Sequence, residues 1–249
     1  LFPWLANDAA QTKADQQERR LWGPTPLLVE KWHSKNHALQ WAQSHGFHPK
    51  TLKSQITFIP PDFFNTPLAE ERLKEKIEAL MGEAQQPITL KPNWGFSGRG
   101  RAGSESISHF NKILGATKRM CHRQKGALLE PWLPRTADYS LLLWLHEDKP
   151  HDIKIMRLHN SASGMYCGHS LHVPSHIKEA LSKVAETLAQ DLREDGYVGP
   201  VSVDAFTFSH EKGEQLRAVV EINARMTMGH LAWWTLSYFK DAQKALFAF

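Results

Sequence analysis

The chain has 249 residues and a net charge of +4, with 41% hydrophobic and 22% charged residues, an ordinary composition for one or two globular domains. No apolar run approaches the roughly 18 residues that a membrane span needs, and the opening stretch LFPWLANDAAQTKADQQERR lacks the features of a signal peptide. The two cysteines, Cys121 and Cys167, make neither a disulfide framework nor a metal-binding pair, which fits a reducing, cytoplasmic compartment.

The first half of the chain is predicted to alternate helices with short strands. The predicted helices are residues 8–22, 29–47, 68–83 and 104–124. Partial helical periodicity with Gly46 as a C-cap supports the second, and a repeated apolar face with Gly82 past its end supports the third. The predicted strands are residues 56–59, which stop at two prolines, and residues 87–91, which lead into a glycine-rich segment.

The second half is predicted to be a sheet with one long helix. The predicted strands are residues 127–133, 140–148, 152–160, 164–171, 196–208 and 216–224. Short turns between the second, third and fourth of these predict an antiparallel meander. Residues 175–195 are strongly amphipathic and predict a helix, and the aromatic residues 226–249 are also predicted to be helical.

These elements predict an α+β chain of two lobes that join near residues 127–133. We divide the chain into an N-terminal segment, residues 1–30, a small lobe, residues 31–125, and a large lobe, residues 126–249. The first residue is leucine rather than methionine. We therefore expect a processed or partial sequence, with the N-terminal segment as the remnant of a preceding domain.

The stretch LKPNWGFSGRGRAG, Leu90–Gly103, places a lysine at a strand end and then several glycines and a serine. Glycines let backbone N–H groups converge on an anion, and a lysine adds a point charge for a phosphate. The stretch is not a P-loop, which needs GK[ST] where a helix starts, and it is not a Rossmann GxGxxG fingerprint. It predicts a phosphate-binding loop, and the alternative is a surface hairpin without a ligand.

A second constellation lies on the last two predicted strands. Asp204 follows the run VSV, and Glu221, Asn223 and Arg225 alternate in VVEINAR. Alternate residues of a strand share one face, so these three side chains are expected to point together, while Val220 and the following isoleucine point into the core. Carboxylate and amide oxygens suit Mg²⁺, and an adjacent arginine can hold a phosphate or a carboxylate. The alternative is an exposed polar strand face.

Three stretches resemble the ATP-grasp superfamily, and their order along the chain also agrees. VEINARMTMG, Val220–Gly229, is similar to the Glu-x-Asn-x-Arg strand of ATP-grasp ligases. LKPNWGFSGRGR resembles the lysine strand and glycine loop of the family, and LLEPWLPRTADYSLLL, Leu128–Leu143, resembles the hinge beside the adenine. The resemblance covers residues 35–229. It implies an ATP-grasp fold in which two α+β lobes grip ATP between them, with a short or truncated N-terminal segment.

The resemblance also implies a role for each matched residue. The implied nucleotide-binding residues are Lys35, Lys91, Ser97, Gly98, Gly100, Glu130, Trp132, Leu133 and Asp138. The implied ligands of Mg²⁺, or alternatively of Mn²⁺, are Asp204, Glu221 and Asn223. Arg225 and Lys91 would act in catalysis. The assignment of Lys35 departs from the family pattern, which usually has an acidic residue where Ser34 stands.

The chemistry of the family implies an ATP-dependent carboxylate–amine ligase. A substrate carboxylate would take the γ-phosphoryl group to form an acyl phosphate, which an amine then attacks, with release of ADP and phosphate. An alternative on the same fold is a small-molecule kinase, and a third is a non-catalytic module that binds nucleotides or polyanions. The expected partners are a small carboxylate and an amine rather than a membrane or a nucleic acid, and a homodimer is compatible with them.

Three further residues are candidates for substrate contacts without support from the resemblance. Lys154 and Arg157 in DIKIMRLHN are an odd number of residues apart, so only one of them can face the site. The alternative for them is a strand edge that faces solvent. His169 in CGHSL either lies near the phosphates or is a hydrogen-bonded histidine without a chemical role.

Overall fold

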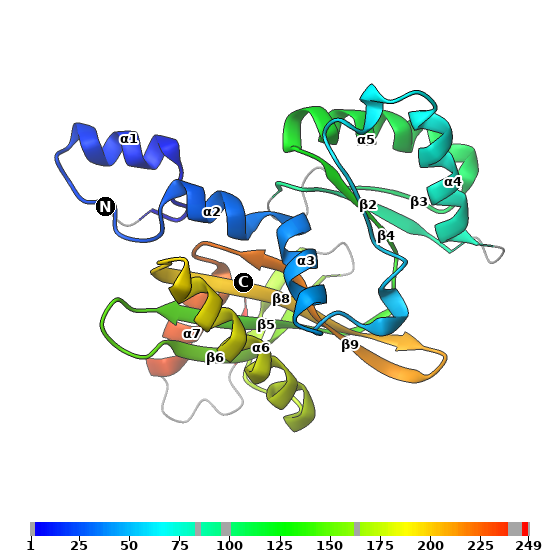
Figure 1. Cartoon of the computed structure of the whole chain (residues 1–249). Helices are drawn as coiled ribbons and strands as arrows, with labels where there is room; N and C mark the ends of the chain where they lie inside the picture. The colour runs from blue at the N-terminus through cyan, green and yellow to red at the C-terminus, as the bar shows by residue number, and fades with distance from the viewer. Residues whose placement is uncertain (1–2, 83–85, 96–100, 162–164, 239–245, 249) are drawn as a thin grey trace. The chain divides into compact units, whose positions relative to one another are not determined.

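The computed structural model describes residues 3–82, 86–95, 101–161, 165–238 and 246–248, and the statements below concern these residues (Figure 1). The chain divides into two compact units. Unit 1 consists of residues 1–47 and 135–249, and unit 2 consists of residues 48–134. Each unit contains an antiparallel sheet with helices packed on it, so the predicted α+β class is confirmed.

Unit 2 is built on a four-stranded antiparallel sheet in the order β1-β4-β2-β3. Its strands are β1 Thr57–Ile59, β2 Ile88–Pro92, β3 Ala102–Ser104 and β4 Ala127–Pro131. Its helices are α4 Ala69–Met81 and α5 Phe110–Gln124, with short 3₁₀ turns at Lys50–Leu52, Phe63–Asn65 and Ile107–His109. The apolar faces of α4 and α5 pack on Ile88 and Leu90 of β2. Lys91 alternates with these residues and therefore lies on the other face of the sheet.

Unit 1 is built on a six-stranded antiparallel sheet in the order β10-β7-β6-β5-β8-β9. Its strands are β5 Arg135–Leu145, β6 Asp152–Asn160, β7 Tyr166–Ser170, β8 Gly199–His210, β9 Gly213–Asn223 and β10 Leu246–Ala248. Its helices are α1 Asp8–Gln16, α2 Pro26–His33, α3 Lys35–Ser44, α6 Ser175–Glu194 and α7 Met228–Tyr238. The antiparallel meander β5-β6-β7 and the long helix α6 follow the sequence-based predictions.

Helices cover both faces of this sheet in unit 1. The apolar stripe of α6 packs on Leu141 and Leu143 of β5, and α7 packs on Leu142 and Met156. Successive residues of a strand point to opposite faces, so α6 and α7 lie on opposite sides of β5. We refer to the side that carries Leu142 as the α7 face.

Helices α2 and α3 also belong to unit 1, because they share its core. The indole N–H of Trp32 donates to Asp195 Oδ2 at 2.7 Å, and that of Trp41 donates to Asp191 Oδ2 at 2.6 Å. The single helix predicted over residues 29–47 is wrong: Ser34 has an extended ψ of 123° and its side chain accepts from the His37 N–H. Ser34 thereby ends one helix and caps the next.

The two units do not follow the predicted ranges 1–30, 31–125 and 126–249. Residues 31–47 join unit 1 through the core of α2 and α3. Strand β4 pairs with β1 and β2, so the chain leaves unit 2 only after Pro134. Two other predictions also differ, since α1 ends at Gln16 rather than at residue 22, and a short strand, β10, pairs with β7 near the C-terminus.

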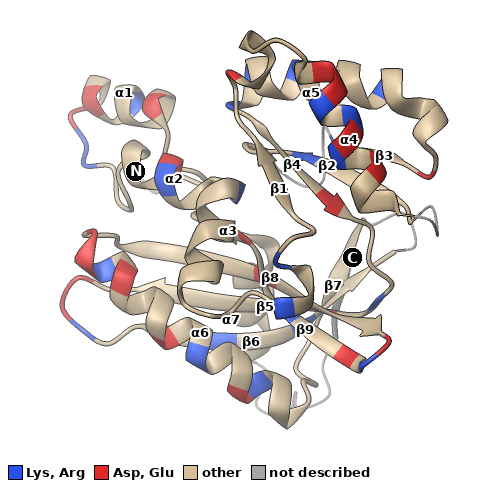
Figure 2. Cartoon of the chain, turned by 45° about the vertical axis from the view of Figure 1, so that its right-hand side comes forward, with Lys and Arg blue, Asp and Glu red and all other residues tan. Residues whose placement is uncertain are grey.

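Charged residues of both signs are interspersed along α4 and α6 (Figure 2). Such a mixture is typical of helix faces in contact with water. None of the described helices combines the length and the apolar character that crossing a membrane would need.

Candidate functional site

Asp204, Glu221, Asn223 and Arg225 are named here the EINAR constellation, after the sequence of residues 221–225. Its two carboxylates lie opposite each other on neighbouring strands of unit 1. In the register of β8 and β9, Asp204 pairs with Glu221 and Ser202 pairs with Asn223. Directly opposite residues in an antiparallel pair point to the same face. Ser140 pairs with Asp204, which places the carboxylates on the α7 face. The sequence-based expectation that these side chains share one face is thus met.

A chain of polar contacts joins these residues to a lysine from α3. Lys35 Nζ lies 2.9 Å from Glu221 Oε2, and the Lys35 side chain is only 7% exposed. The Asn223 amide donates to Asp204 Oδ2 at 3.3 Å, and Arg225 Nη2 donates to Asn223 Oδ1 at 3.2 Å. The structure therefore gathers all the predicted polar residues of this constellation, together with Lys35, within unit 1.

The apolar residues around the constellation differ from the prediction in one respect. The register of β8 and β9 shifts between Asp204 and Phe206, so extra residues of β9 bulge opposite Ala205. Ile222 is buried as predicted, but Val220 is only partly buried and Val219 enters the core instead. A bulge changes which residues of a strand face the core, and strict alternation cannot anticipate it.

The two carboxylates stand in unequal electrostatic surroundings. Burial and the neighbouring Glu221 carboxylate raise the pKa of Asp204 to about 8, although Arg225 and Asn223 act in the opposite direction. Burial lowers the pKa of Arg225, and both carboxylates oppose that shift. Lys35 contacts Glu221, whereas Asp204 accepts from the neutral amide of Asn223 and hydrogen-bonds with the Glu221 carboxyl. Asp204 is thus the carboxylate whose negative charge is less well compensated.

The donor set fits a hard divalent cation. The Asp204 and Glu221 carboxylates share one face of the sheet, and the Asn223 amide lies beside them with its N–H directed to Asp204 and its oxygen accepting from Arg225. Mg²⁺ prefers one or two carboxylates completed by water and phosphate oxygens, so the two carboxylates suit it, and Asn223 would have to turn its amide to offer its oxygen. Within the described ranges, no group of three or more His, Cys, Asp and Glu side chains is placed to hold a metal ion. A cation at this position would favour the ionised form of Asp204.

The second group of predicted residues lies in unit 2. Lys91 on β2 forms an ion pair with Glu130 on β4, and the Glu130 side chain is almost fully buried. Thr89 pairs with Glu130 and Lys91 pairs with Leu128, so the ion pair lies on the face that α4 and α5 leave open. A buried ion pair of this kind fixes the direction of the lysine side chain.

The chain after β4 carries the predicted hinge residues. The Trp132 N–H donates to the carbonyl of Pro87 at 2.7 Å, which fastens this segment to the start of β2. The Trp132 ring is 45% exposed, and the Arg101 guanidinium lies 5.1 Å from its centroid. Leu133 is buried. The Trp132 side chain therefore points towards solvent, and the Leu133 side chain points towards the protein interior.

The glycine-rich segment connects two strands of a hairpin. Strands β2 and β3 pair antiparallel with Ile88 opposite Ser104, so the segment between them is the hairpin connection. Ser97, Gly98 and Gly100 lie outside the described residues. The prediction that they cover phosphates remains a prediction.

The remaining predicted polar residues lie on both faces of the unit 1 sheet. Asp138 forms an ion pair with Arg135 at 3.0 Å and accepts a hydrogen bond from Asn160 at 3.4 Å. Lys154 is opposite Leu142 and so lies on the α7 face, whereas Arg157 is opposite Tyr139 and lies on the other. Only Lys154 thus shares a face with the carboxylates.

His169 is a buried histidine whose two ring nitrogens both have partners. Its Nε2 lies 3.0 Å from Ser140 Oγ, and its Nδ1 lies 2.9 Å from the Tyr166 hydroxyl. Burial, reinforced by neighbouring histidines, lowers its pKa to about 4, so its ring is neutral at pH 7. These contacts favour the interpretation of His169 as a structural residue beneath the site.

Sequence reasoning missed His230, which holds the turn after β9. Its Nδ1 accepts from the Thr227 N–H at 3.2 Å, and its Nε2 lies 3.2 Å from the carbonyl oxygen of Leu143. His230 is fully buried, and burial lowers its pKa to about 4. The Thr-x-x-His spacing in TMGH was the available signal, because a side chain three residues on can accept from a turn N–H.

Neither protein-family models nor curated protein sequences match the chain. Solved structures do match its fold. The biotin carboxylase domain of the Hydrogenobacter thermophilus 2-oxoglutarate carboxylase, in complex with MgADP, ADP and bicarbonate, has a TM-score of 0.62 and 14% identity, over 88% of this chain and 46% of that one. D-alanyl-alanine synthetase A from Vibrio cholerae has a TM-score of 0.60 and 14% identity, over 87% of this chain and 62% of that one.

A third similar structure is the biotin carboxylase of Campylobacter jejuni in its β,γ-ATP complex. It has a TM-score of 0.67 and 15% identity, over 98% of this chain and 52% of that one. The chain therefore spans about half the length of the solved structures that it resembles. At these identities the likeness concerns the fold. Taken together with the paired sheets and the EINAR strand, it shows that the chain has the fold of the ATP-grasp superfamily, as its sequence motifs predict.

Proposed function

We propose that this chain belongs to an ATP-dependent ligase that activates a substrate carboxylate as an acyl phosphate for attack by an amine. The convergence of Asp204, Glu221, Asn223 and Arg225 on one face, with Lys35 beside them, is the observation that carries the proposal. A binding module without chemistry has no physical need for two neighbouring carboxylates of which one, Asp204, has a pKa raised by burial and by the charge of the other.

The proposed reaction has two steps. A carboxylate oxygen of the substrate attacks the γ-phosphorus of ATP, and the bond to ADP breaks. The amine then attacks the acyl carbon, phosphate leaves, and the amine loses a proton. Asp204, Glu221 and Asn223 would hold Mg²⁺, which would neutralise charge on the phosphate oxygens.

The cationic side chains have separate proposed tasks. Arg225 presents a guanidinium whose planar donors suit a phosphate or carboxylate, and its contact with Asn223 fixes its direction. Lys35 holds Glu221 in place, and Lys91 in unit 2 is the proposed contact of the nucleotide phosphates. Trp132 and Leu133 are the proposed neighbours of the adenine.

Calorimetric titration of ATP with and without Mg²⁺ tests the nucleotide site. We expect micromolar affinity that needs Mg²⁺ and falls at least about tenfold in Glu221→Gln and in Lys91→Met. Glu179→Gln is the matched control, because it removes a carboxylate from the exposed face of α6. Equal binding by all the variants would contradict the site assignment.

The reaction class is tested separately. Release of ADP that depends on a carboxylic acid, with hydroxamate formed when hydroxylamine is added, would identify an acyl phosphate. Phosphorylation of a hydroxyl substrate without hydroxamate would identify a kinase instead. ATP binding without turnover of any acid or alcohol would leave only the nucleotide-binding part of the proposal.

A further inference from the structure

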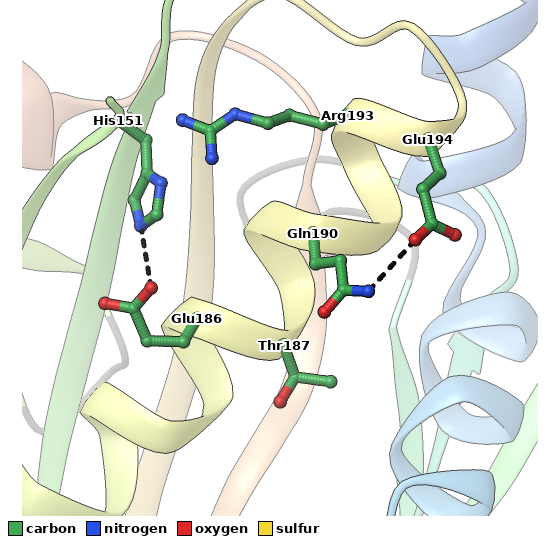
Figure 3. Close-up of a pocket in the computed structure, with 6 residues that line it drawn as sticks. All are labelled: His151, Glu186, Thr187, Gln190, Arg193 and Glu194. Carbon is green, nitrogen blue, oxygen red and sulfur yellow. Dashed lines mark hydrogen bonds and ion pairs between the residues drawn. The ribbon is translucent and has the colours of Figure 1, made fainter. Parts of the chain in front are cut away.

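A hollow of about 410 Å³ lies in unit 1 between the start of β6 and the exposed face of α6 (Figure 3). The residues that line it are His151, Glu186, Thr187, Gln190, Arg193 and Glu194. Helix α6 packs on the sheet face opposite to the α7 face. The hollow is therefore separate from the Asp204 and Glu221 site, and its volume lies within the roughly 300–1,000 Å³ of small-molecule sites.

His151 forms one wall of the hollow and has an unused ring nitrogen. Its side chain is only 10% exposed, and its Nε2 lies 3.3 Å from Glu186 Oε2. In the tautomer whose Nε2–H donates to this carboxylate, Nδ1 carries a lone pair. Nδ1 is buried and has no hydrogen-bond partner among the described residues. A buried polar atom without a partner costs free energy, which a ligand N–H or O–H group would recover.

Arg193 brings a guanidinium towards the same place. Figure 3 shows its side chain extended from α6 towards His151. Across the described part of the chain, no hydrogen bond or ion pair engages this guanidinium. A guanidinium presents paired donors that match a carboxylate.

The other charges in the hollow restrict the ligand. Glu186 and Glu194 are both acidic, and Glu194 accepts a hydrogen bond from the Gln190 amide at 3.0 Å. Two carboxylates beside one guanidinium disfavour a simple anion, because the acidic groups would repel it. Arg193 disfavours a simple cation for the same reason. A ligand with both charges meets complementary groups.

We propose that this hollow binds an α-amino acid as its zwitterion. The carboxylate of the amino acid lies on the Arg193 guanidinium, and its ammonium donates to His151 Nδ1 and to the Glu186 carboxylate. The side chain of the amino acid lies along Thr187 and Gln190. This inference goes beyond the proposed ligase activity, because it uses other residues on the other side of the sheet.

Ligand-observed NMR and calorimetry on the intact chain, with a panel of the common α-amino acids as probes, test the proposal. We expect at least one of them to bind with a Kd of about 1 mM or lower. Its N-acetyl derivative lacks the ammonium charge and its amide lacks the carboxylate, and each should bind at least about tenfold more weakly. Acetate and inorganic phosphate serve as probes for a site that takes any anion.

Matched variants assign the binding to this hollow. Arg193→Gln and His151→Phe should each weaken the amino acid at least about tenfold. Lys183→Gln removes a positive charge from the same helix outside the hollow and should change nothing. Thermal melting of each variant establishes that the chain is folded.

Three results would overturn the proposal. They are the absence of binding by every amino acid up to about 10 mM, phosphate or acetate binding as tightly as the amino acid, and unchanged affinity in Arg193→Gln. Because ATP binding is measured with other residues, failure here leaves the proposed nucleotide site unaffected.

Discussion

Asp204 and Glu221 lie opposite each other on the neighbouring strands β8 and β9, yet their surroundings compensate their negative charges differently. Glu221 has the Lys35 ammonium at 2.9 Å, while Asp204 has the Asn223 amide at 3.3 Å. Burial and repulsion raise the pKa of Asp204 to about 8. At neutral pH this carboxyl is therefore mostly protonated when no cation is present. As the proposed ligand of a metal ion, Asp204 would have to lose that proton, and we therefore expect cation binding and protonation to be linked at this residue.

Mg²⁺ binding is expected to release a proton from Asp204. Because burial and the Glu221 carboxylate raise its pKa, the Asp204 carboxyl of the metal-free chain favours its protonated form at neutral pH. Affinity for Mg²⁺ should therefore rise with pH and level off above about pH 8. Calorimetry in two buffers of different ionisation enthalpy measures the protons released. An affinity for Mg²⁺ that does not change with pH would show that Asp204 is ionised before the metal arrives.

Asp204→Asn is expected to stabilise the metal-free chain at alkaline pH while it abolishes Mg²⁺ binding. The pKa of Asp204 rises from 3.8 to about 8 on folding, so the free energy of unfolding falls as pH rises through that window. An amide does not ionise and escapes this loss. We expect its Tm to lie several °C above that of the native chain at pH near 8.

The stability gain of this variant should shrink as the pH falls to 4 and below, where the Asp204 carboxyl of the unfolded chain also becomes protonated. Thermal melts without metal across this pH range measure the difference. Glu179→Gln, a change of the same kind at an exposed position, is the control. A variant that is less stable than the native chain at pH 8 would contradict the raised pKa.

Among the secondary-structure elements, the short helix α3 has the largest effect on the site. Ser34 stops α2, caps α3, and so makes Lys35 the first residue of the second helix. An uninterrupted helix through residue 34 would continue the α2 direction and move the lysine away from Glu221. Trp41 then anchors α3 through its bond to Asp191 of α6. A capping residue thus determines where Lys35 lies relative to Glu221.

Ser34→Ala is expected to lower the free energy of unfolding by about 0.5–2 kcal/mol, the usual cost of a lost N-cap. Ser34→Asn should recover most of this loss, because asparagine caps as well as serine does. Denaturant unfolding measures both variants, and Ser54→Ala at an exposed turn is the control. Equal stability of the alanine and asparagine variants would show that the Ser34 cap does not determine where α2 ends and α3 begins.

Gly126, just after α5, is expected to tolerate no side chain. It has a φ of +117°, and a Cβ there would lie 2.5 Å from a ring carbon of Phe58 and 2.8 Å from the carbonyl oxygen of Ile59. Gly126→Ala should therefore cost about 2 kcal/mol or more. Gly196→Ala is the matched control, since Gly196 has a positive φ but open space around it. Gly196→Ala should lower the free energy of unfolding by about 1 kcal/mol, from backbone strain alone.

Elements with strong local signals could be predicted from the sequence, and those set by distant contacts could not. Helix α6 has a continuous apolar stripe, and the strands of the meander are bounded by turn residues. The boundary at residue 47 depends on α2 and α3 packing with strands far along the chain. The EINAR residues were found because alternation places them together, whereas the pairing of Lys35 with Glu221 joins helix α3 to strand β9.

At the scale of the molecule, unit 1 is made from two separate stretches of chain with unit 2 between them. The core of unit 1 includes Trp32 and Trp41 from the first stretch together with Val203 and Ile222 from the second. Unit 2 has a core of its own, built from α4, α5 and its sheet. The two units thus differ in how much of the chain each needs in order to fold.

Residues 48–134 expressed alone are expected to fold, because the hydrophobic core of unit 2 is contained in that range. Residues 135–249 alone are not, because the core surface that Trp32 and Trp41 cover would be exposed to water. Circular dichroism and amide NMR spectra of the two pieces show whether each of them is folded. Cooperative melting of residues 135–249 would show that α2 and α3 are dispensable.

The interrupted course of unit 1 has a consequence for the order of events at the ribosome. Helix α3 is synthesised early, but β9, which carries Glu221, emerges about 180 residues later. In the interval unit 2 can close its own sheet, since its contacts span a shorter stretch of chain. Helices α2 and α3 must wait with Trp32 and Trp41 uncovered until β8 and β9 have been synthesised. Folding of the six-stranded sheet therefore depends on two stretches of chain that are made far apart in time.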